Sequence, residues 1–270
     1  MRLAVSELEA FYAGPLGAVA SAVVRDKLVQ AWDQAARLRV VGFGYAGPFL
    51  SAFTESERRI ALCPEGTGVR AGCETPSVLV HDHRWPLPDA SVDRLLIVHG
   101  LEEVSGPRRL LREAWRVLAD DGLMIIVAAN RRGLWSLLET SPFAAGRPYT
   151  RRQLDRLLEE SMFAPTAHAI ALHFPPIESA GFLRLARTWE RMGNSLESLV
   201  VRGLYPNFAG LNLVEARKSA AIPISGSKAE VFRPGLLIPQ GLRPASNRQG
   251  RDRTNNASSA NKFEKPGRSA

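Results

Sequence analysis

The sequence predicts an α/β domain built on a doubly wound, mostly parallel sheet. Strand-like and helix-like segments alternate over the first 216 of the 270 residues, which is typical of parallel strands joined by right-handed crossover helices. The strand-like segments are continuous runs of Val, Ile and Leu, and such runs indicate a sheet covered on both faces. Sheets of this kind bind ligands at the carboxyl ends of their strands.

The predicted elements are short and separated by turn residues. In chain order they are a helix over 18–36, strands over 38–44, 58–63, 76–81 and 92–99, a helix over 106–119, a strand over 122–130, a helix over 150–163, a strand over 166–174, a helix over 179–204 and a strand over 208–217. The helix over 150–163 has a defined start, because Gln153 follows Thr150 at the spacing of a capping box.

Charge is divided unevenly along the chain. The total of 35 Lys and Arg against 27 Asp and Glu gives a net charge of +8. The first 216 residues hold 24 basic and 24 acidic residues, whereas residues 217–270 hold 11 basic and 3 acidic residues. The folded part is therefore neutral, and a basic groove for a nucleic-acid backbone is not expected on it.

Residues 218–270 are predicted to form a disordered basic tail. From residue 217 onward the chain contains five Pro, five Gly, seven Ser and four Asn. Such a segment buries too little apolar area to offset the entropy lost on ordering. Contact with a surface is expected only around residues 231–239. The alternative is a basic arm that binds an anionic membrane surface or a nucleic acid.

Cysteine use and hydropathy predict a soluble cytoplasmic protein. Two cysteines, Cys63 and Cys73, are too few for a disulfide-stabilised secreted domain and lack zinc-binding spacing. No apolar run approaches the roughly 18–20 residues of a membrane span. The first 17 residues contain acidic residues where a signal peptide has an apolar stretch.

A glycine-rich turn, Gly42–Gly47, directly follows the first predicted strand. Its sequence GFGYAG fits the pattern GxGxxG, in which glycines let the backbone approach a ligand at the start of a helix. The same glycines also suit a tight turn that binds nothing. A dinucleotide site needs an acidic residue at the end of the second strand, but the chain has Cys63 and Pro64 there, with Glu65 two positions late. An NAD-binding protein is therefore retained only as an alternative.

Two later segments carry a family resemblance. WPLPDASVDRLLIVHGLEEV (85–104) and LLREAWRVLADDGLMIIVAAN (110–130) resemble the class I S-adenosylmethionine-dependent methyltransferases, most closely the small-molecule branch that includes ubiquinone-pathway enzymes. The matching features are the turn at Trp85 and Pro86, the acidic step Asp89–Asp93, the strand Leu95–His99 and the helix end Arg116–Gly122. The resemblance spans about residues 36–216.

The resemblance implies the fold, the domains and the activity. The fold is a three-layer Rossmann-like sheet of seven strands, of which the last, 208–217, is antiparallel. The domains are an N-terminal helical cap (1–36), a methyltransferase domain (37–217) with a helical insertion at about 178–205, and the basic tail. The implied activity is methyl transfer from S-adenosylmethionine to a small, hydrophobic or aromatic acceptor.

The resemblance also assigns cofactor contacts, residue by residue. The methionyl part would lie against the glycine turn, the ribose near the end of the second strand, and the adenine near the end of the third. The residues concerned are Gly42, Phe43 and Gly44 for the methionyl part, Glu65 for the ribose, and Asp82 (or His81 if the register shifts by one) with His83 for the adenine.

His99, at the end of the fourth strand, would face the transferred methyl group. It is the candidate base, because imidazole accepts a phenol or amine proton near neutral pH; a ring that only caps the strand is the alternative. Phe11, Tyr12 and Trp135 are the predicted acceptor contacts. The helix over 179–204 is either a packed crossover or a lid over an apolar acceptor, and with its arginines it also suits an anionic membrane surface.

Three departures from the family pattern support a different interpretation. Val40 stands where the family has an acidic residue, the carboxylate at the end of the second strand is missing, and Glu103 replaces a histidine. Each missing charge-assisted hydrogen bond is worth about 1.5–3 kcal/mol. The first alternative is therefore an inactive methyltransferase fold that acts as a binding or scaffold protein. The HDH sequence at 81–83 lacks a third ligand at recognisable spacing, so no metal is expected.

Overall fold

The computed structural model describes residues 2–33, 35–69, 75–138, 141–201, 208–219 and 230–231. It begins with two helices, α1 (Val5–Ala13) and α2 (Pro15–Trp32), which meet at Gly14 and pack against each other. Their close approach needs Gly17, because a side chain there would overlap with the backbone of Phe11. The structure thus adds a separate first helix, which the sequence pattern did not define.

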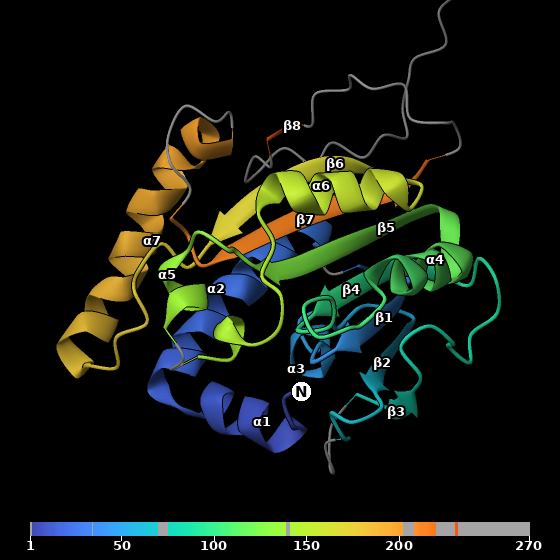
Figure 1. Ribbon diagram of the computed structural model, residues 1–270, viewed down its shortest axis with the longest axis horizontal. Coiled ribbons are helices and arrows are strands. Elements are labelled where there is room, and N and C mark those ends of the chain that lie inside the picture. The colour runs from blue at the N-terminus through green and yellow to red at the C-terminus, as the bar shows by residue number, and fades with distance from the viewer. Residues whose placement is uncertain are drawn as a thin grey trace, which may run out of the picture. The chain divides into compact units, whose positions relative to one another are not determined.

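One mixed sheet forms the centre of the fold (Figure 1). Its strands are β1 (Arg39–Gly44), β2 (Arg58–Pro64), β3 (Ser77–Val80), β4 (Val92–Val98), β5 (Leu118–Ala129), β6 (Phe163–Ala171), β7 (Leu211–Lys218) and β8 (Glu230–Val231). Their order is β3-β2-β1-β4-β5-β7-β6-β8. Strands β1 to β5 pair in parallel, and β7 lies antiparallel between β5 and β6. The predicted antiparallel insertion of the last long strand is confirmed.

Helices cover both faces of this sheet. In Figure 1, α4 (Pro107–Val117) and α6 (Arg151–Glu160) lie in front of the sheet and α2 lies behind it. Helix α7 (Ala180–Val201) packs on α2 and β6. Successive residues of one strand pack into hydrophobic clusters on opposite faces of the sheet. Val40 belongs to the cluster under α2, and Val41 belongs to the cluster under α4. The continuous apolar strands therefore have the cause that the sequence predicted.

Some boundaries differ from the prediction. The glycine pattern predicts the start of a helix, and the segment after the glycine turn forms a single helical turn, α3 (Gly47–Leu50). Strand β5 begins four residues earlier than expected, because Leu118 already pairs with Val92 across an irregularity in the β4–β5 register. Two residues of the predicted tail form β8, parallel to β6. The two residues of β8 and the pair Lys218 and Ser219 are the described part of the predicted disordered tail. The rest of this tail lies outside the described residues.

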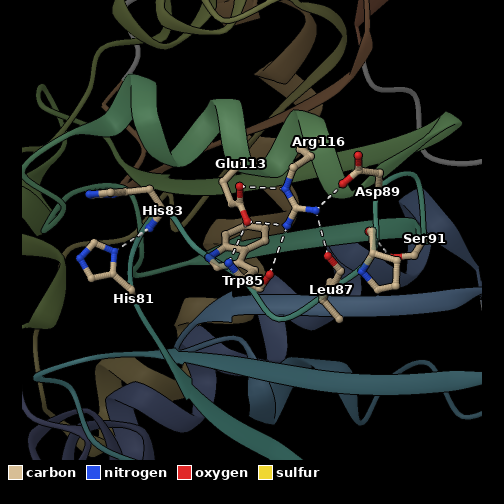
Figure 2. A network of polar contacts seen from close by, with 9 residues as sticks. His81, His83, Trp85, Leu87, Asp89, Ser91, Glu113 and Arg116 are labelled. Carbon is tan, nitrogen blue, oxygen red and sulfur yellow. Dashed lines mark hydrogen bonds and ion pairs between the residues drawn. The ribbon is translucent and has the colours of Figure 1, made fainter.

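A polar network fixes the connection between β3 and β4 onto α4 (Figure 2). The Arg116 guanidinium donates hydrogen bonds to the carbonyl oxygens of Leu87 (2.9 Å) and Trp85 (3.1 Å) and pairs with Glu113 and Asp89. Glu113 in turn accepts the backbone N–H of Trp85 at 2.7 Å. These contacts raise the pKa of Arg116, chiefly through its hydrogen bonds to the two carboxylates. The segments that carry the family resemblance are thus held together by this arginine.

Candidate functional site

The carboxyl ends of β1 and β4 meet where the direction of strand order reverses, which is where open α/β sheets bind ligands. Gly44 ends β1 with a φ of +84°, and an added Cβ would overlap with the carbonyl oxygen of Val98. Directly after it, the backbone N–H of Tyr45 donates to the same oxygen at 2.8 Å. Gly44 therefore brings the turn after β1 against the backbone of β4.

Gly42 has a packing role as well. A Cβ at this position would lie 2.5 Å from the Cβ of Ala46 and 3.1 Å from the side chain of Leu50. The tight turn thus needs both glycines whether or not a ligand binds, and their contact with a cofactor stays a prediction. Because α3 is a single turn, it offers little of the dipole that a full helix would supply.

The first residues of the chain lie across the ends of β2, β3 and β4. We call Arg2–Val5 the N-terminal strap. Its Arg2 guanidinium binds both carboxylate oxygens of Asp82, at 2.8 and 3.1 Å, and the carbonyl oxygen of Glu65 at 3.0 Å. The backbone N–H of Leu3 donates to Glu103 at 3.1 Å, and the N–H of Val5 donates to the carbonyl oxygen of Thr67 at 2.7 Å.

Aromatic side chains from four parts of the chain surround His99. The hydroxyl of Tyr12 in α1 lies 2.7 Å from His99 Nε2, and its ring stacks on Tyr45 with centroids 5.2 Å apart. Phe143, from the 3₁₀ turn η1 (Pro142–Ala144), lies 4.6 Å from the His99 ring, and Phe49 of α3 packs edge-on against Tyr12. This aromatic cluster brings α1 onto the end of β4.

Burial fixes the protonation of the Tyr12–His99 pair. His99 is 8% exposed, and burial lowers the pKa of its imidazole to about 3. Burial also raises the pKa of Tyr12. Both partners of the 2.7 Å hydrogen bond between the Tyr12 hydroxyl and His99 Nε2 are therefore uncharged. His99 also has a φ of +47°, a backbone conformation that costs energy for a residue with a side chain and that collects at functional sites.

The adjacent Glu102 is a buried carboxyl group that the sequence analysis did not single out. Its Oε1 accepts the backbone N–H of Ala129 at 2.8 Å, while no described residue hydrogen-bonds to its buried Oε2. Burial raises the pKa of Glu102 to about 7, against the lowering effect of that hydrogen bond. The one sequence signal was a pair of adjacent acidic residues after a buried strand, which also describes a solvated turn.

An apolar pocket of about 340 Å³ lies between α1 and the segment around η1. It is lined by Leu3, Glu7, Phe11, Ser141, Pro142, Ala144 and Ala145. Phe11 links it to the aromatic cluster, since its ring contacts those of Tyr12 and Phe143 with centroids 5.0 and 6.1 Å away. The rings of Tyr12 and Phe143 thus lie between Phe11 at the pocket and His99.

Of the three predicted acceptor contacts, one lines the pocket, one lies beside His99 and one lies in the core. Phe11 lines the pocket, and Tyr12 lies beside His99. Trp135, in the short helix α5 (Leu134–Leu137), is fully buried and donates its indole N–H to the carbonyl oxygen of Phe174 at 2.6 Å. Trp135 lies behind Phe143 and outside the pocket lining.

The predicted cofactor residues at β2 and β3 already have partners within the chain. The Glu65 side chain is exposed, and its carbonyl oxygen accepts from Arg2. Asp82 is paired with the same arginine. The backbone N–H of His83, expected to meet the adenine, is directed at His81 Nδ1, 3.4 Å away (Figure 2). Sequence reasoning missed Arg2, because nothing marks it as a partner of residues 80 positions away.

Helix α7 packs one face on the domain and exposes another. Leu185, Trp189 and Met192 are 53%, 43% and 65% exposed and share one side of the helix, with the exposed Arg184 and Arg191 next to them. The contact with an anionic membrane surface that was expected of this helix stays a prediction. Within the described residues, no helix has both the length and the apolar character that crossing a membrane requires.

Known proteins match both the sequence and the fold. The family described as "Methyltransferase domain" matches residues 28–126. YafS of Escherichia coli K12, itself described as uncharacterized, is 33% identical over 147 residues, which are 52% of this chain and 53% of YafS. The chain therefore spans about half the length of this curated relative.

Two solved structures share the fold. An S-adenosylmethionine-dependent methyltransferase of Thermotoga maritima, described as a possible histamine N-methyltransferase, is 18% identical, with 80% of this chain and 96% of that chain covered and a TM-score of 0.53. A second one, from Aquifex aeolicus, is 14% identical, with 80% and 98% covered and a TM-score of 0.51. The chain therefore has the fold of the class I S-adenosylmethionine-dependent methyltransferases, and residues 28–126 resemble the methyltransferase-domain family. Its place in the ubiquinone-pathway branch stays a prediction.

The chemistry at the strand ends suits S-adenosylmethionine, the cofactor that the resemblance implies. S-adenosylmethionine offers hydroxyl and amino donors on its nucleoside, and the ends of β2, β3 and β4 offer the acceptors Thr67 O, the Asp82 carboxylate and the Glu103 carboxylate. These acceptors are bonded to the N-terminal strap. The donor and acceptor types therefore fit the cofactor, but the strap uses the same groups.

Proposed function

We propose that the protein binds S-adenosylmethionine at the carboxyl ends of β1 to β4 and transfers its methyl group to a small, hydrophobic or aromatic acceptor. The observation that carries the acceptor class is the apolar pocket between α1 and η1. Its volume of about 340 Å³ lies at the low end of the range for small-molecule sites. Phe11 offers an aromatic wall, and among the described residues of the lining Glu7 is the one that carries a charge.

The cofactor supplies an activated methyl group on a sulfonium, and the chain's residues position the acceptor. Methyl transfer is an in-line displacement, so alignment and exclusion of water contribute most of what the protein must do. The aromatic cluster around His99 suits this task, because its rings are packed and uncharged. Tyr12, whose hydroxyl is hydrogen-bonded to His99 Nε2, orients the imidazole.

The assignment of His99 as a base is revised by its environment. A general base works best with a pKa near the operating pH, whereas burial lowers the pKa of His99 to about 3 and Tyr12 holds its Nε2. In the proposed reaction His99 therefore stays uncharged and hydrogen-bonded to Tyr12, and acceptors that lose their proton without help are favoured. A rate that is flat from pH 6 to 8 would support this role.

Calorimetric titration of the full chain separates the proposed function from its alternatives. Binding of S-adenosylhomocysteine without binding of NAD supports the methyltransferase; binding of NAD alone supports the dinucleotide alternative. Binding of neither ligand supports the scaffold alternative. A panel of phenols and aromatic amines, assayed by release of S-adenosylhomocysteine, then tests the acceptor class. Phe11→Ala should raise KM for the best acceptor more than it lowers kcat, and an unchanged KM would remove the acceptor from this pocket.

A further inference from the structure

We infer that the N-terminal strap is an intramolecular competitor of the cofactor, so that S-adenosylmethionine binds only when residues 2–5 leave the ends of β2, β3 and β4. The inference rests on the proposed cofactor binding and adds its control by the chain's own first residues. Two sets of contacts carry it: the pair between Arg2 and Asp82, and the backbone bonds of Leu3 and Val5.

Arg2 and Asp82 form a bidentate ion pair that is largely shielded from solvent. Both carboxylate oxygens are engaged, at 2.8 and 3.1 Å, and the two side chains are only 13% and 17% exposed. Bidentate Arg–carboxylate pairs are stronger and more specific than single hydrogen bonds, and pairs shielded from solvent are less screened than surface pairs. Arg2 also reaches the carbonyl oxygen of Glu65, so one side chain joins the ends of β2 and β3.

The backbone of the strap binds the neighbouring strand ends. Leu3 donates to the carboxylate of Glu103, which follows β4, and Val5 donates to the carbonyl oxygen of Thr67, which follows β2. Gly68 leaves little room above this contact, since a Cβ there would lie 3.2 Å from the Val5 side chain. The strap is therefore seated against the strand ends along its whole length.

Strap and cofactor require the same acceptors. A carboxylate whose two oxygens both accept from Arg2 offers poorer sites to a nucleoside hydroxyl or amino group in the same plane. A lid that closes over a bound cofactor would leave the strand-end acceptors open for it, whereas this strap is bonded to them directly. Removing one charge-assisted contact of the strap should therefore strengthen cofactor binding by about tenfold.

The test compares three versions of the 270-residue chain that begin at Met1, with any purification tag at the C-terminus. Isothermal titration with S-adenosylhomocysteine is carried out on the wild type, Arg2→Ala and the control Arg25→Ala. Arg25 is an exposed residue of α2 whose contacts are with Pro48 and Ser51. We expect Arg2→Ala to bind about tenfold more tightly than the wild type and Arg25→Ala to bind like it.

Hydrogen exchange of the strap gives a second readout that does not depend on affinity. The amides of Leu3 and Val5 should exchange slowly in the free wild type and faster when S-adenosylhomocysteine is bound. Slower exchange on binding would mean that the strap closes over the ligand, and this result overturns the inference, as does equal or weaker binding by Arg2→Ala. Absence of binding in all three proteins overturns the proposed function together with the inference, whereas wild-type binding that Arg2→Ala leaves unchanged overturns the inference alone.

Discussion

Replacing Arg116 by Ala should lower the free energy of unfolding by about 2 kcal/mol. The side chain donates to two backbone carbonyl oxygens, those of Trp85 and Leu87, and each such contact to a charged donor contributes about 1.5–3 kcal/mol when shielded. Arg116 is 34% exposed, and its partner Asp89 is 78% exposed, so solvent replaces part of the loss. The expected loss of unfolding free energy is therefore closer to the contribution of one shielded hydrogen bond than to that of two.

Thermal and urea unfolding of the full chain measure this loss. For a domain of about 200 residues, 2 kcal/mol corresponds to a decrease of about 4–8 °C in Tm. Arg108→Ala is the matched control, because Arg108 lies on the same helix and, in the part of the chain that the structure describes, forms its ion pair with Glu160 alone, with side chains 70% and 32% exposed. Exposed pairs contribute about 0–1 kcal/mol. Equal decreases in Tm for the two variants would refute the assignment of Arg116 as the residue that holds the β3–β4 connection.

Three further changes test other parts of the structure. Gly44→Ala should lower the free energy of unfolding by more than about 3 kcal/mol, because the new Cβ would overlap with Val98 in addition to the strain of a positive φ. The control Gly66→Ala, where φ is +89° and no described atom is near the new Cβ, should lower it by about 1 kcal/mol. Equal losses of stability in urea unfolding would contradict the packing role of Gly44. Burial raises the pKa of Glu102 in the folded protein to about 7 from an ordinary 4.5, so the free energy of unfolding should fall as pH rises from 4.5 to 7. Glu102→Gln should remove this pH dependence and be up to about 3 kcal/mol more stable than the wild type at pH 8. Parallel pH profiles of stability for the two proteins would contradict the assignment to Glu102. Trp189→Ser should reduce co-sedimentation of the full chain with phosphatidylcholine–phosphatidylglycerol vesicles, and undiminished binding would exclude α7 from the contact.

The sheet could be predicted because burial on both faces leaves a direct trace in the sequence. Residues such as Val40 and Val41 point to opposite cores, so both must be apolar, and the resulting run marks the strand. The turn after β1 left no equally clear trace of the element that comes next. The GxGxxG pattern predicts that a helix starts there but not how long it is, and a single turn, α3, forms before the chain continues to β2.

The residues of the candidate site could be named from the sequence, but their contacts with one another could not. His99 and Asp82, which follow β4 and β3, were named because the family resemblance puts site residues at these strand ends. Their partners Tyr12 and Arg2 come from the first helix and the strap, and no local pattern encodes a contact between residues 80 or more positions apart. Glu102 was missed for a different reason, since burial rather than residue type gives it an unusual pKa.

The glycine turn and the strap together show why a glycine pattern does not by itself establish a binding site. In this chain Gly44 is required by the approach of β1 to β4, and Gly42 by the packing of Ala46 and Leu50. Both requirements would remain in a protein that had lost its ligand. In the proposed binding mode, entry of a nucleoside depends instead on Asp82, Thr67 and Glu103, whose acceptor oxygens are bonded to residues 2–5. An active enzyme and an inactive relative of this fold would therefore differ less in the glycine turn than in how firmly those first residues hold the strand ends.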